Sequence, residues 1–298
     1  MSKFSPRRGA ALALIGLAAC TTTATNNAAD HSGHDSIAPG SVAAAAPNNA
    51  LPADAAGARA RLAASPRHAE WVMISAGADS VRAYVVYPER KTKAPVVVVV
   101  HEIYGLSPWI KGVADQLAAD GFIAIAPDLL TTKNLPSPTD SVPAELATAA
   151  IRTLDANDVH RQITAAAKYA MALPSALPRY GIVGYCWGGG VSFQQAVRDP
   201  DLGASVVYYG VSPAPAVLNS VKAPVLGLYG GNDARVNSTI PPADTAMRAM
   251  NKTYTYHIYE GAGHGFLRQQ AGQAGANQKA TEQAWPATIA WFRKYLDS

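Results

Sequence analysis

Five consecutive valines, Val96–Val100, follow Pro95 and constrain the fold of this chain more than any other stretch of its sequence. Valine is β-branched and favours extended backbone. The run also lacks the alternation of apolar and polar residues that a strand with one face in water would show. A strand of this kind is buried on both faces, as in a parallel sheet covered by helices on either side. We therefore expect an α/β domain built around this strand.

Other segments extend the expected sheet on both sides of the valine strand. Trp71–Ser75 and Val81–Tyr87 alternate apolar and polar residues around a short turn, which predicts an antiparallel hairpin at a sheet edge. Further strands are expected at 122–126, 180–184, 206–209, 225–229 and 254–259, and helices at 110–120, within 146–173, and at 191–197, 243–250 and 278–295. Strands separated by helices imply a mostly parallel, doubly wound sheet with helices on both faces.

The beginning of the chain has the pattern of an export signal. Three basic residues precede the apolar stretch GAALALIGLAA, which is too short to span a bilayer as an ordinary helix. The next residue is Cys20, and the letters LAAC resemble the lipobox of bacterial lipoproteins. We therefore expect a signal peptide over residues 1–19, lipid on Cys20, and a membrane-anchored protein of the cell envelope that faces the periplasm. The alternative is an ordinary secretory signal and a periplasmic or secreted protein.

Residues 20–66 are rich in Thr, Asn, Ala, Ser and Pro, and we expect them to form a flexible tether. Within them, His31 and His34 are close enough to bind a metal ion together, but incidental histidines in a solvated linker explain them more simply. The remainder, residues 67–298, is long enough for one α/β domain with a sizeable core.

The charge of the chain gives no indication of a nucleic-acid partner. The net charge is +4, and removal of residues 1–19 would take away three basic residues and no acidic ones, leaving +1. No stripe of Lys and Arg with interleaved aromatic residues occurs. The sequence contains neither a dinucleotide-binding fingerprint nor zinc-ligand spacing, so the expected chemistry uses no metal and no cofactor.

The second of the two cysteines, Cys186, lies in the letters GYCWG, between an expected strand and an expected helix. This spacing matches the G-x-S-x-G elbow that presents a nucleophile, with cysteine in place of serine. The alternative is a buried structural thiol beside a glycine turn, since free cysteine is among the most buried residue types. If Cys20 carries lipid, Cys186 has no partner in the chain for a disulfide.

Two further residues complete a possible catalytic triad. Asp233 follows the strand expected at 225–229, and His264 follows the strand expected at 254–259. Chemistry in open α/β sheets collects at the carboxyl ends of the strands, and nucleophile, acid, histidine is the chain order of α/β-hydrolase triads. Taken alone, Asp233 could cap a helix and His264 could be bonded within a turn. Their order after Cys186, each at a strand end, favours catalysis.

These residue types suit attack on a carbonyl carbon. Cys186 would attack as a thiolate, which the dipole of the following helix favours. His264 would move the proton, and Asp233 would hold the imidazole in the required tautomer. The peptide N–H of Trp187 and a second one from the loop after the valine strand would form an oxyanion hole. Glu102 also follows that strand, where a carboxylate must be paired or functional, unless it bonds a local backbone amide.

With these motifs in place, residues 67–298 resemble the dienelactone hydrolase family, the carboxymethylenebutenolidases, which have the α/β-hydrolase fold. The matching segments are HEIYGL, GFIAIAPDLL, GIVGYCWGGG, VVYYG, GGNDARV and YEGAGHGFLR. The resemblance implies Cys186 as nucleophile, His264 as base and Asp233 as the orienting acid. It also implies that Glu102 controls the thiol, pairing near it at rest and helping to form the thiolate when substrate arrives.

The resemblance also implies how the substrate is held. The peptide N–H groups of Ile103 and Trp187 would form the oxyanion hole. Arg268, four residues beyond His264, would pair with a substrate carboxylate, and Tyr104 of HEIYGL is expected to contact the substrate.

Three features depart from the family pattern, and the first is the lipoprotein signal, which is unlike the soluble cytoplasmic enzymes of the family. The family has a second carboxylate-binding arginine after the APDLL strand, and here Arg152 and Arg161 are available but neither aligns with it. Trp187 is bulky, whereas a smaller apolar residue is common at its position. These departures leave the substrate open.

We therefore expect a carboxylic ester hydrolase (EC 3.1.1 class) that acts on small esters or lactones through an acyl-thioester on Cys186. Because of the export signal and the missing arginine, a broad-specificity carboxylesterase of the envelope that does not act on dienelactones is an alternative. A non-catalytic binding protein of the same fold is a further one. No oligomeric state is predicted.

Overall fold

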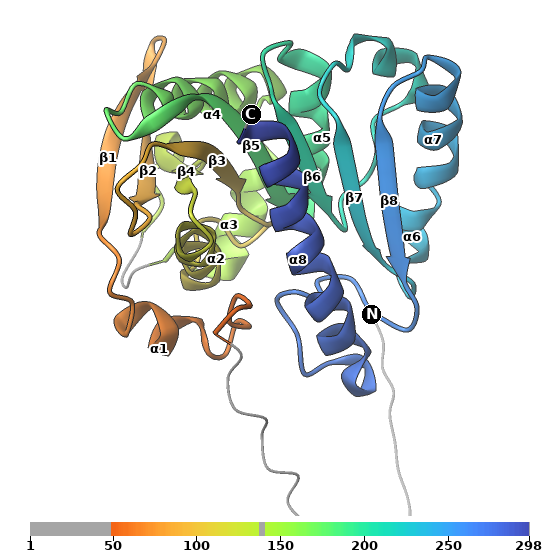
Figure 1. Cartoon of the computed structure of the whole chain (residues 1–298), viewed down its shortest axis with the longest axis horizontal. Helices are drawn as coiled ribbons and strands as arrows, with labels where there is room; N and C mark the ends of the chain where they lie inside the picture. Colours follow the sequence, from red (N-terminus) through yellow and green to blue (C-terminus); the bar gives the residue numbers. More distant parts are fainter. Residues whose placement is uncertain (1–48, 137–140, 298) are drawn as a thin grey trace, which may run out of the picture. The chain divides into compact units, whose positions relative to one another are not determined.

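The computed structural model describes residues 49–136 and 141–297. Within them, one sheet contains eight strands, which are β1 (Ala69–Ala76), β2 (Asp79–Val86), β3 (Ala94–Val100), β4 (Ile123–Asp128), β5 (Ala176–Tyr185), β6 (Ala204–Tyr208), β7 (Val225–Gly230) and β8 (Tyr254–Tyr259). Their order across the sheet is β1-β2-β4-β3-β5-β6-β7-β8 (Figure 1). β2 runs antiparallel to both β1 and β4, and all other neighbours are parallel. The mostly parallel sheet with a hairpin at one edge is confirmed.

Helices cover both faces of this sheet (Figure 1). The helices are α1 (Ala58–Ala63), α2 (Pro108–Ala119), α3 (Ala144–Ile151), α4 (Ala156–Met171), α5 (Trp187–Arg198), α6 (Ala234–Asn237), α7 (Ile240–Ala249) and α8 (Ala276–Leu296), with 3-10 turns η1 (Thr131–Lys133), η2 (Pro215–Ser220) and η3 (Gln273–Gly275). α1, α2 and α8 pack into one apolar core, and α4, α5 and α7 pack into the other. The doubly wound plan is therefore confirmed.

The valine run has the two-sided burial that its sequence predicts. Val96, Val98 and Val100 belong to the core under α4 and α5, whereas Val97 and Val99 belong to the core under α2 and α8. All five side chains are fully buried. Complete burial of a valine is worth about 1.5–3 kcal/mol, so β3 anchors both layers at once.

The alanine-rich stretch within 146–173 forms two helices, α3 and α4, instead of one long one. Asp155 is the reason for the break, because its side chain caps the start of α4. It accepts hydrogen bonds from the backbone N–H groups of Asn157 and Asp158, at 2.8 and 3.1 Å. A carboxylate at this position satisfies N–H groups that have no partner inside the helix.

Part of the segment that was expected to be a tether is folded onto the domain. Leu51 is buried and Ala58 of α1 is fully buried, both in the core shared with α2 and α8. The expectation of a flexible linker up to residue 66 is therefore wrong for residues 51–63. The helix has only six residues, too few for a visible apolar period, which explains why composition alone suggested a linker.

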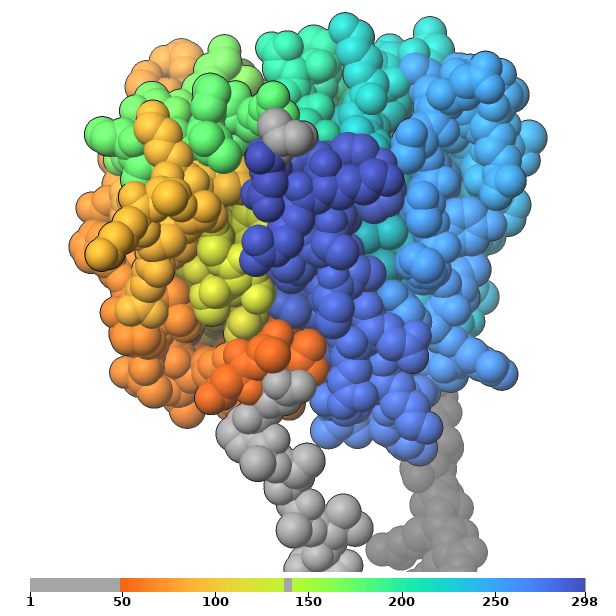
Figure 2. Space-filling view, in the orientation of Figure 1, coloured from red at the N-terminus to blue at the C-terminus, as the bar shows by residue number. Residues whose placement is uncertain are grey.

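Hydrogen bonds fasten the same segment to the far end of the chain. The N–H of Ala55 donates to the carbonyl of Arg268 at 2.9 Å, and the side-chain amide of Gln270 donates to the carbonyl of Pro52 at 2.9 Å. In Figure 2 the orange N-terminal part of the domain lies directly against blue C-terminal residues. The folded domain thus begins no later than Leu51, earlier than the expected residue 67.

Several expectations lie outside the described residues. These are the signal peptide over residues 1–19, lipidation of Cys20, the pair His31 and His34, and the tether as far as residue 48. In the part of the chain that the structure describes, no helix combines the length and the apolar character needed to cross a membrane.

Candidate functional site

The carboxyl ends of three neighbouring strands lie level with one another. Val100 at the end of β3 pairs with Gly184 of β5, and Tyr185 pairs with Tyr208 of β6. The residues that follow these strands therefore stand in a row at one edge of the sheet, with neighbouring strands about 4.8 Å apart. Glu102, Cys186 and Tyr209 occupy this row.

Cys186 lies at a sharp bend between β5 and α5. Its φ and ψ angles are 57° and −115°, and this backbone costs a residue with a side chain roughly 1–3 kcal/mol. The flanking glycines make the bend possible. A Cβ on Gly184 would lie 1.8 Å from the carbonyl oxygen of Gly188, and one on Gly188 would lie 2.4 Å from that of His101. The GYCWG pattern is thus a steric requirement of the bend.

Asp233 and His264 come together from different strand ends, as predicted. Nδ1 of His264 lies 2.5 Å from Oδ2 of Asp233, whose side chain is buried. The other oxygen of Asp233 accepts the N–H of Val236 and caps α6. Because an ionised carboxylate only accepts hydrogen bonds, Nδ1 of His264 carries the proton and Nε2 is left with its lone pair. The side chain of His264 is 35% exposed, so Nε2 is open to a substrate.

The thiol of Cys186 is partly buried, and the charges of Glu102, Asp233 and Arg235 act on it. Burial raises its pKa above the ordinary value, the peptide N–H of Trp187 opposes the rise, and the negative charge of Glu102 adds to it. The positive charge of Arg235, on α6, also lowers the pKa of the thiol. Within residues 49–136 and 141–297, no hydrogen bond joins Sγ of Cys186 to His264. The cysteine is therefore a thiol at rest.

Glu102 is buried at the end of the row and faces Arg268. Nε of Arg268 lies 2.8 Å from Oε1 of Glu102. The N–H is not aimed at the oxygen, so the contact is an ion pair without good hydrogen-bond geometry. Burial raises the pKa of Glu102 to about 7, and the charge of Arg268 opposes the rise. A carboxyl group with such a pKa exchanges a proton readily near neutral pH.

Tyr104 and Arg268, which were expected to bind substrate, line one cavity beside Glu102. The guanidinium of Arg268 lies 4.8 Å from the centre of the Tyr104 ring. The cavity has a volume of about 350 Å³ and is completed by Ser107, Pro108 and residues 141–144. A cation on an aromatic wall suits a small ligand that carries a negative charge.

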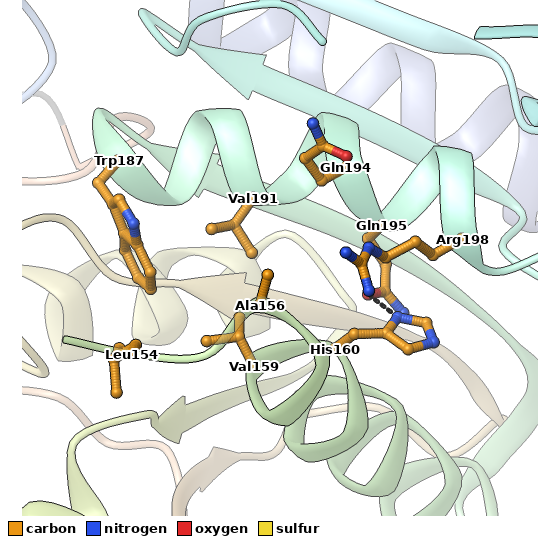
Figure 3. Close-up of a pocket in the computed structure, with 9 residues that line it drawn as sticks. All are labelled: Leu154, Ala156, Val159, His160, Trp187, Val191, Gln194, Gln195 and Arg198. Atoms are coloured by element: carbon orange, nitrogen blue, oxygen red, sulfur yellow. Dashed lines mark hydrogen bonds between the residues drawn. The ribbon is translucent and has the colours of Figure 1, made fainter. Parts of the chain in front are cut away.

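A second cavity, of about 260 Å³, lies between α4 and α5 (Figure 3). Leu154 and Trp187 form its apolar end, and His160 and Arg198 lie at its polar end. None of its lining residues belongs to the expected triad. Its apolar end reaches the side chain of Trp187, the residue that follows Cys186.

The loop after β3 contains Ile103, whose peptide N–H was expected to be the second donor of an oxyanion hole. The peptide N–H of Ile103 donates to no other backbone group among the described residues, while that of Trp187 faces Sγ of Cys186. The side chain of Trp187 stacks on His101, with ring centres 5.6 Å apart. Both N–H groups thus remain available to an oxygen atom next to Sγ.

His101 holds this loop in place, although no motif of the sequence assigns it that role. It is fully buried, and its Nε2 accepts the N–H of Leu129 at 3.3 Å. Its Nδ1 must therefore carry the proton, which it donates to the carbonyl of Glu102 at 2.9 Å. Burial lowers the pKa of His101, which keeps the ring neutral. Its position between the valine strand and Glu102 was the available signal.

Tyr209 is a second residue whose place at the site no sequence motif indicates. It follows β6 with a φ of 39°, and its buried ring meets the ring of His264 edge-on at 5.2 Å. The letters VVYYG mark the end of that strand but do not show which tyrosine turns towards the histidine.

The two arginines considered as a second carboxylate ligand lie elsewhere. Arg161 of α4 forms ion pairs with Asp79 and Asp158. Arg152 ends α3, and neither arginine lines the cavity beside Arg268. That cavity therefore presents a single arginine among the residues that the structure describes.

Known proteins resemble this chain over most of the folded domain. The model of the dienelactone hydrolase family matches residues 81–296. A relative from Salmonella typhimurium, named by inference as a carboxymethylenebutenolidase, is 31% identical over 229 residues, 73% of this chain and 84% of the relative. A relative from Bradyrhizobium, named by inference as a 2-oxo-3-(5-oxofuran-2-ylidene)propanoate lactonase, is 31% identical over 241 residues, 76% of this chain and 94% of the relative.

Solved structures show the same fold. A crystal structure from Klebsiella pneumoniae, assigned by inference as a dienelactone hydrolase, superposes with a TM-score of 0.68 at 27% identity, covering 77% of this chain and 99% of that one. A dienelactone hydrolase-like promiscuous phosphotriesterase from metagenomic libraries has a TM-score of 0.67 at 22% identity with the same coverage. The protein is an α/β-hydrolase that acts on ester or lactone bonds, and it belongs to the dienelactone hydrolase family.

Proposed function

We propose that the protein is a thiol hydrolase of small esters or lactones, with Cys186 as nucleophile, His264 as base and Asp233 as the orienting acid. The observation that carries the proposal is the Asp233–His264 pair at 2.5 Å beside a cysteine held at a strained bend. The pair leaves Nε2 of His264 as the free base, and strain of this kind is concentrated at functional sites.

The reaction would proceed in two halves. Sγ of Cys186 attacks the carbonyl carbon, and the oxygen that becomes negative accepts the N–H groups of Ile103 and Trp187. The C–O bond breaks, the leaving alcohol takes up the proton that Sγ lost, and an acyl-thioester remains. Water then gives a proton to Nε2 of His264 and attacks the thioester, the acid leaves, and Nε2 returns the proton to the sulfur. With a lactone, the alcohol stays attached to the acyl group.

Glu102 would act as the base that forms the thiolate of Cys186, and it would do so only when substrate is present. At rest, Arg268 compensates its charge, and the thiol of Cys186 stays protonated. A substrate carboxylate that binds Arg268 would release Glu102, which would then accept the proton of Sγ. The pKa of about 7 for Glu102 suits this transfer near neutral pH.

The decisive experiment replaces the sulfur. Cys186→Ala should lower turnover of activated esters by on the order of 10⁴-fold or more, because the nucleophile is lost while the bend is kept. Ser192→Ala, a change on the following helix that is buried away from the row, is the matched control and should retain turnover. Undiminished hydrolysis by a folded Cys186→Ala protein would contradict the proposal.

A broad-specificity carboxylesterase is the second candidate, and the single arginine in the cavity favours it. An anionic lactone and a neutral acetate ester separate the two candidates. If the substrate carboxylate binds Arg268, Arg268→Ala should impair the lactone alone, by tenfold or more, whereas the exposed control Arg248→Ala should affect neither. Equal effects on both substrates would favour the broad esterase.

We further propose that residues 1–19 are an export signal and that Cys20 carries lipid, on the strength of the LAAC letters after the apolar stretch. Cells that express the full chain should incorporate labelled fatty acid into it, and Cys20→Ala should abolish the label. Label that persists in the variant would refute lipidation at this residue.

A further inference from the structure

Tyr209 is held at the site by strain and by packing. Its φ of 39° is rare for a tyrosine, and its N–H is fixed by the carbonyl of Leu228 at 2.9 Å. The ring is 1% exposed and packs edge-on against His264 and Phe266, with centres 5.2 and 5.3 Å apart. A strained backbone conformation of this kind persists where the surrounding structure fixes it, and such residues cluster at functional sites.

The register of the sheet places this residue beside the thiol. Tyr185 pairs with Tyr208, so Tyr209 stands level with Cys186, and the pairing of Val100 with Gly184 places Glu102 level with Cys186 on the other side. Glu102 and Tyr209 thus follow the two strands next to β5, and the charges of Glu102 and Cys186 both act on the hydroxyl of Tyr209.

Two buried oxygens in this row lack a hydrogen bond. Among the described residues, the hydroxyl of Tyr209 and Oε1 of Glu102 have no hydrogen-bond partner. An unpaired buried hydroxyl is costly, so a hydrogen bond that Tyr209 gains during the reaction would be favourable. Tyr209 stays neutral because burial raises the pKa of its hydroxyl well above the ordinary value. It is therefore a donor at any working pH.

We propose that Tyr209 is a positioning residue that receives Glu102 during the reaction: its hydroxyl donates to the Glu102 carboxylate when an anionic substrate occupies Arg268. The inference rests on the proposed function and adds the partner that Glu102 gains when it loses the arginine. A buried carboxylate released from Arg268 would otherwise be left without compensation among the described residues. The hydroxyl keeps Glu102 next to Sγ until the proton is transferred.

The titratable and charged groups around Glu102 come from four elements. They are Arg268 from the loop after β8, Cys186 after β5, Tyr209 after β6 and His101 on its own loop, which is neutral. In the free enzyme, burial raises the pKa of Glu102, and the charge of Arg268 opposes that rise. Once substrate holds Arg268, Tyr209 is the neighbour able to donate a proton to a hydrogen bond, because Cys186 is the group to be deprotonated.

The free enzyme and the substrate complex should respond differently to pH when the hydroxyl of Tyr209 is removed. A hydrogen bond to the ionised carboxylate lowers its pKa, so loss of the hydroxyl raises the pKa of Glu102 in the complex. Glu102 must be ionised to accept the thiol proton, so the acid limb of kcat should move to higher pH in Tyr209→Phe. The acid limb of kcat/KM reports the free enzyme, where Glu102 faces Arg268, and should not move.

The experiment compares Tyr209→Phe with Tyr185→Phe on an anionic lactone. Tyr185 is the matched control, since its hydroxyl is equally buried and also lacks a hydrogen bond among the described residues. We expect the acid limb of kcat to rise by about one pH unit in Tyr209→Phe alone, the effect of a hydrogen bond to a charged group. Glu102→Gln should remove this limb, and adding Tyr209→Phe to it should cause no further shift.

Three results would overturn the inference: an unshifted kcat limb in Tyr209→Phe, an equal shift in Tyr185→Phe, or a limb that persists in Glu102→Gln. The last test holds even where Tyr209→Phe does not fold. Cys186→Ala separates this inference from the proposed function. Turnover that survives in Cys186→Ala refutes the thiol mechanism. If Cys186→Ala is inactive but the acid limb of kcat does not shift in Tyr209→Phe, only the positioning role of Tyr209 is refuted.

Discussion

Replacement of Glu102 by glutamine should stabilise the protein, and the gain should depend on pH. Burial raises the pKa of Glu102 from 4.5 to about 7 in the folded state, and the effect of Arg268 is already included in that value. The folded state therefore binds a proton more tightly than the unfolded state does. The favourable linkage is complete below pH 4.5 and is lost as the pH rises through about 7.

The size of the effect follows from the shift of the pKa. At about 1.4 kcal/mol per unit, the shift corresponds to a cost on the order of 3 kcal/mol once Glu102 is ionised. Glu102→Gln carries no such cost, so its advantage over the wild type in the free energy of unfolding should grow by that amount between the two ends of the pH window. Urea unfolding at each end measures it, with the slope m checked for constancy.

The control for this prediction is Glu89→Gln, which changes an exposed glutamate away from the site and should leave the pH dependence as in the wild type. The reasoning would be refuted if the difference in unfolding free energy between Glu102→Gln and the wild type were the same at both ends of the window. That result would mean that Glu102 is solvated or fully compensated in the folded protein.

Three further predictions concern the bend, the histidine and the N-terminal segment. Gly188→Ala should prevent the native bend, because its Cβ would lie 2.4 Å from the carbonyl oxygen of His101, and near-ultraviolet circular dichroism should show lost packing; a native spectrum with full turnover would contradict the steric reading. Asp233→Asn should lower kcat by about 10⁴-fold with the fold intact, since an amide can stabilise the other tautomer of His264, and a loss of less than tenfold would exclude the orienting role. Leu51→Ala should lower the free energy of unfolding by about 2–4 kcal/mol in urea titration, and no measurable change would show that this segment adds nothing to the core.

The sheet could be predicted from the sequence because its strands carry strong local signals. The valine run, the apolar stretches before each functional residue and the hairpin alternation all survive in the folded protein. Two elements could not be predicted in the same way. α1 is too short to show a period, and the cap at Asp155 lies inside an alanine-rich stretch that favours helix on both sides.

The candidate site was predictable as a set of residues but not as a set of contacts. Chain order and strand ends were enough to select Asp233 and His264, which then meet at 2.5 Å. The ion pair between Glu102 and Arg268 joins residues from opposite halves of the chain, so it depends on the strand order across the sheet. The positive φ of Tyr209 is imposed by tertiary packing, and no local sequence pattern indicates it.

The N–H of Ala55 donates a hydrogen bond to the backbone carbonyl of Arg268, the residue whose side chain faces Glu102. A protein truncated to begin at residue 67 would lack this hydrogen bond, although it would keep every side chain of the site. Arg268 would then be held less firmly, and substrate preference would change with it. Selectivity measured on a truncated protein would therefore reflect the truncation as well as the enzyme. The stretch that leads into the domain is, in this sense, a part of the binding apparatus.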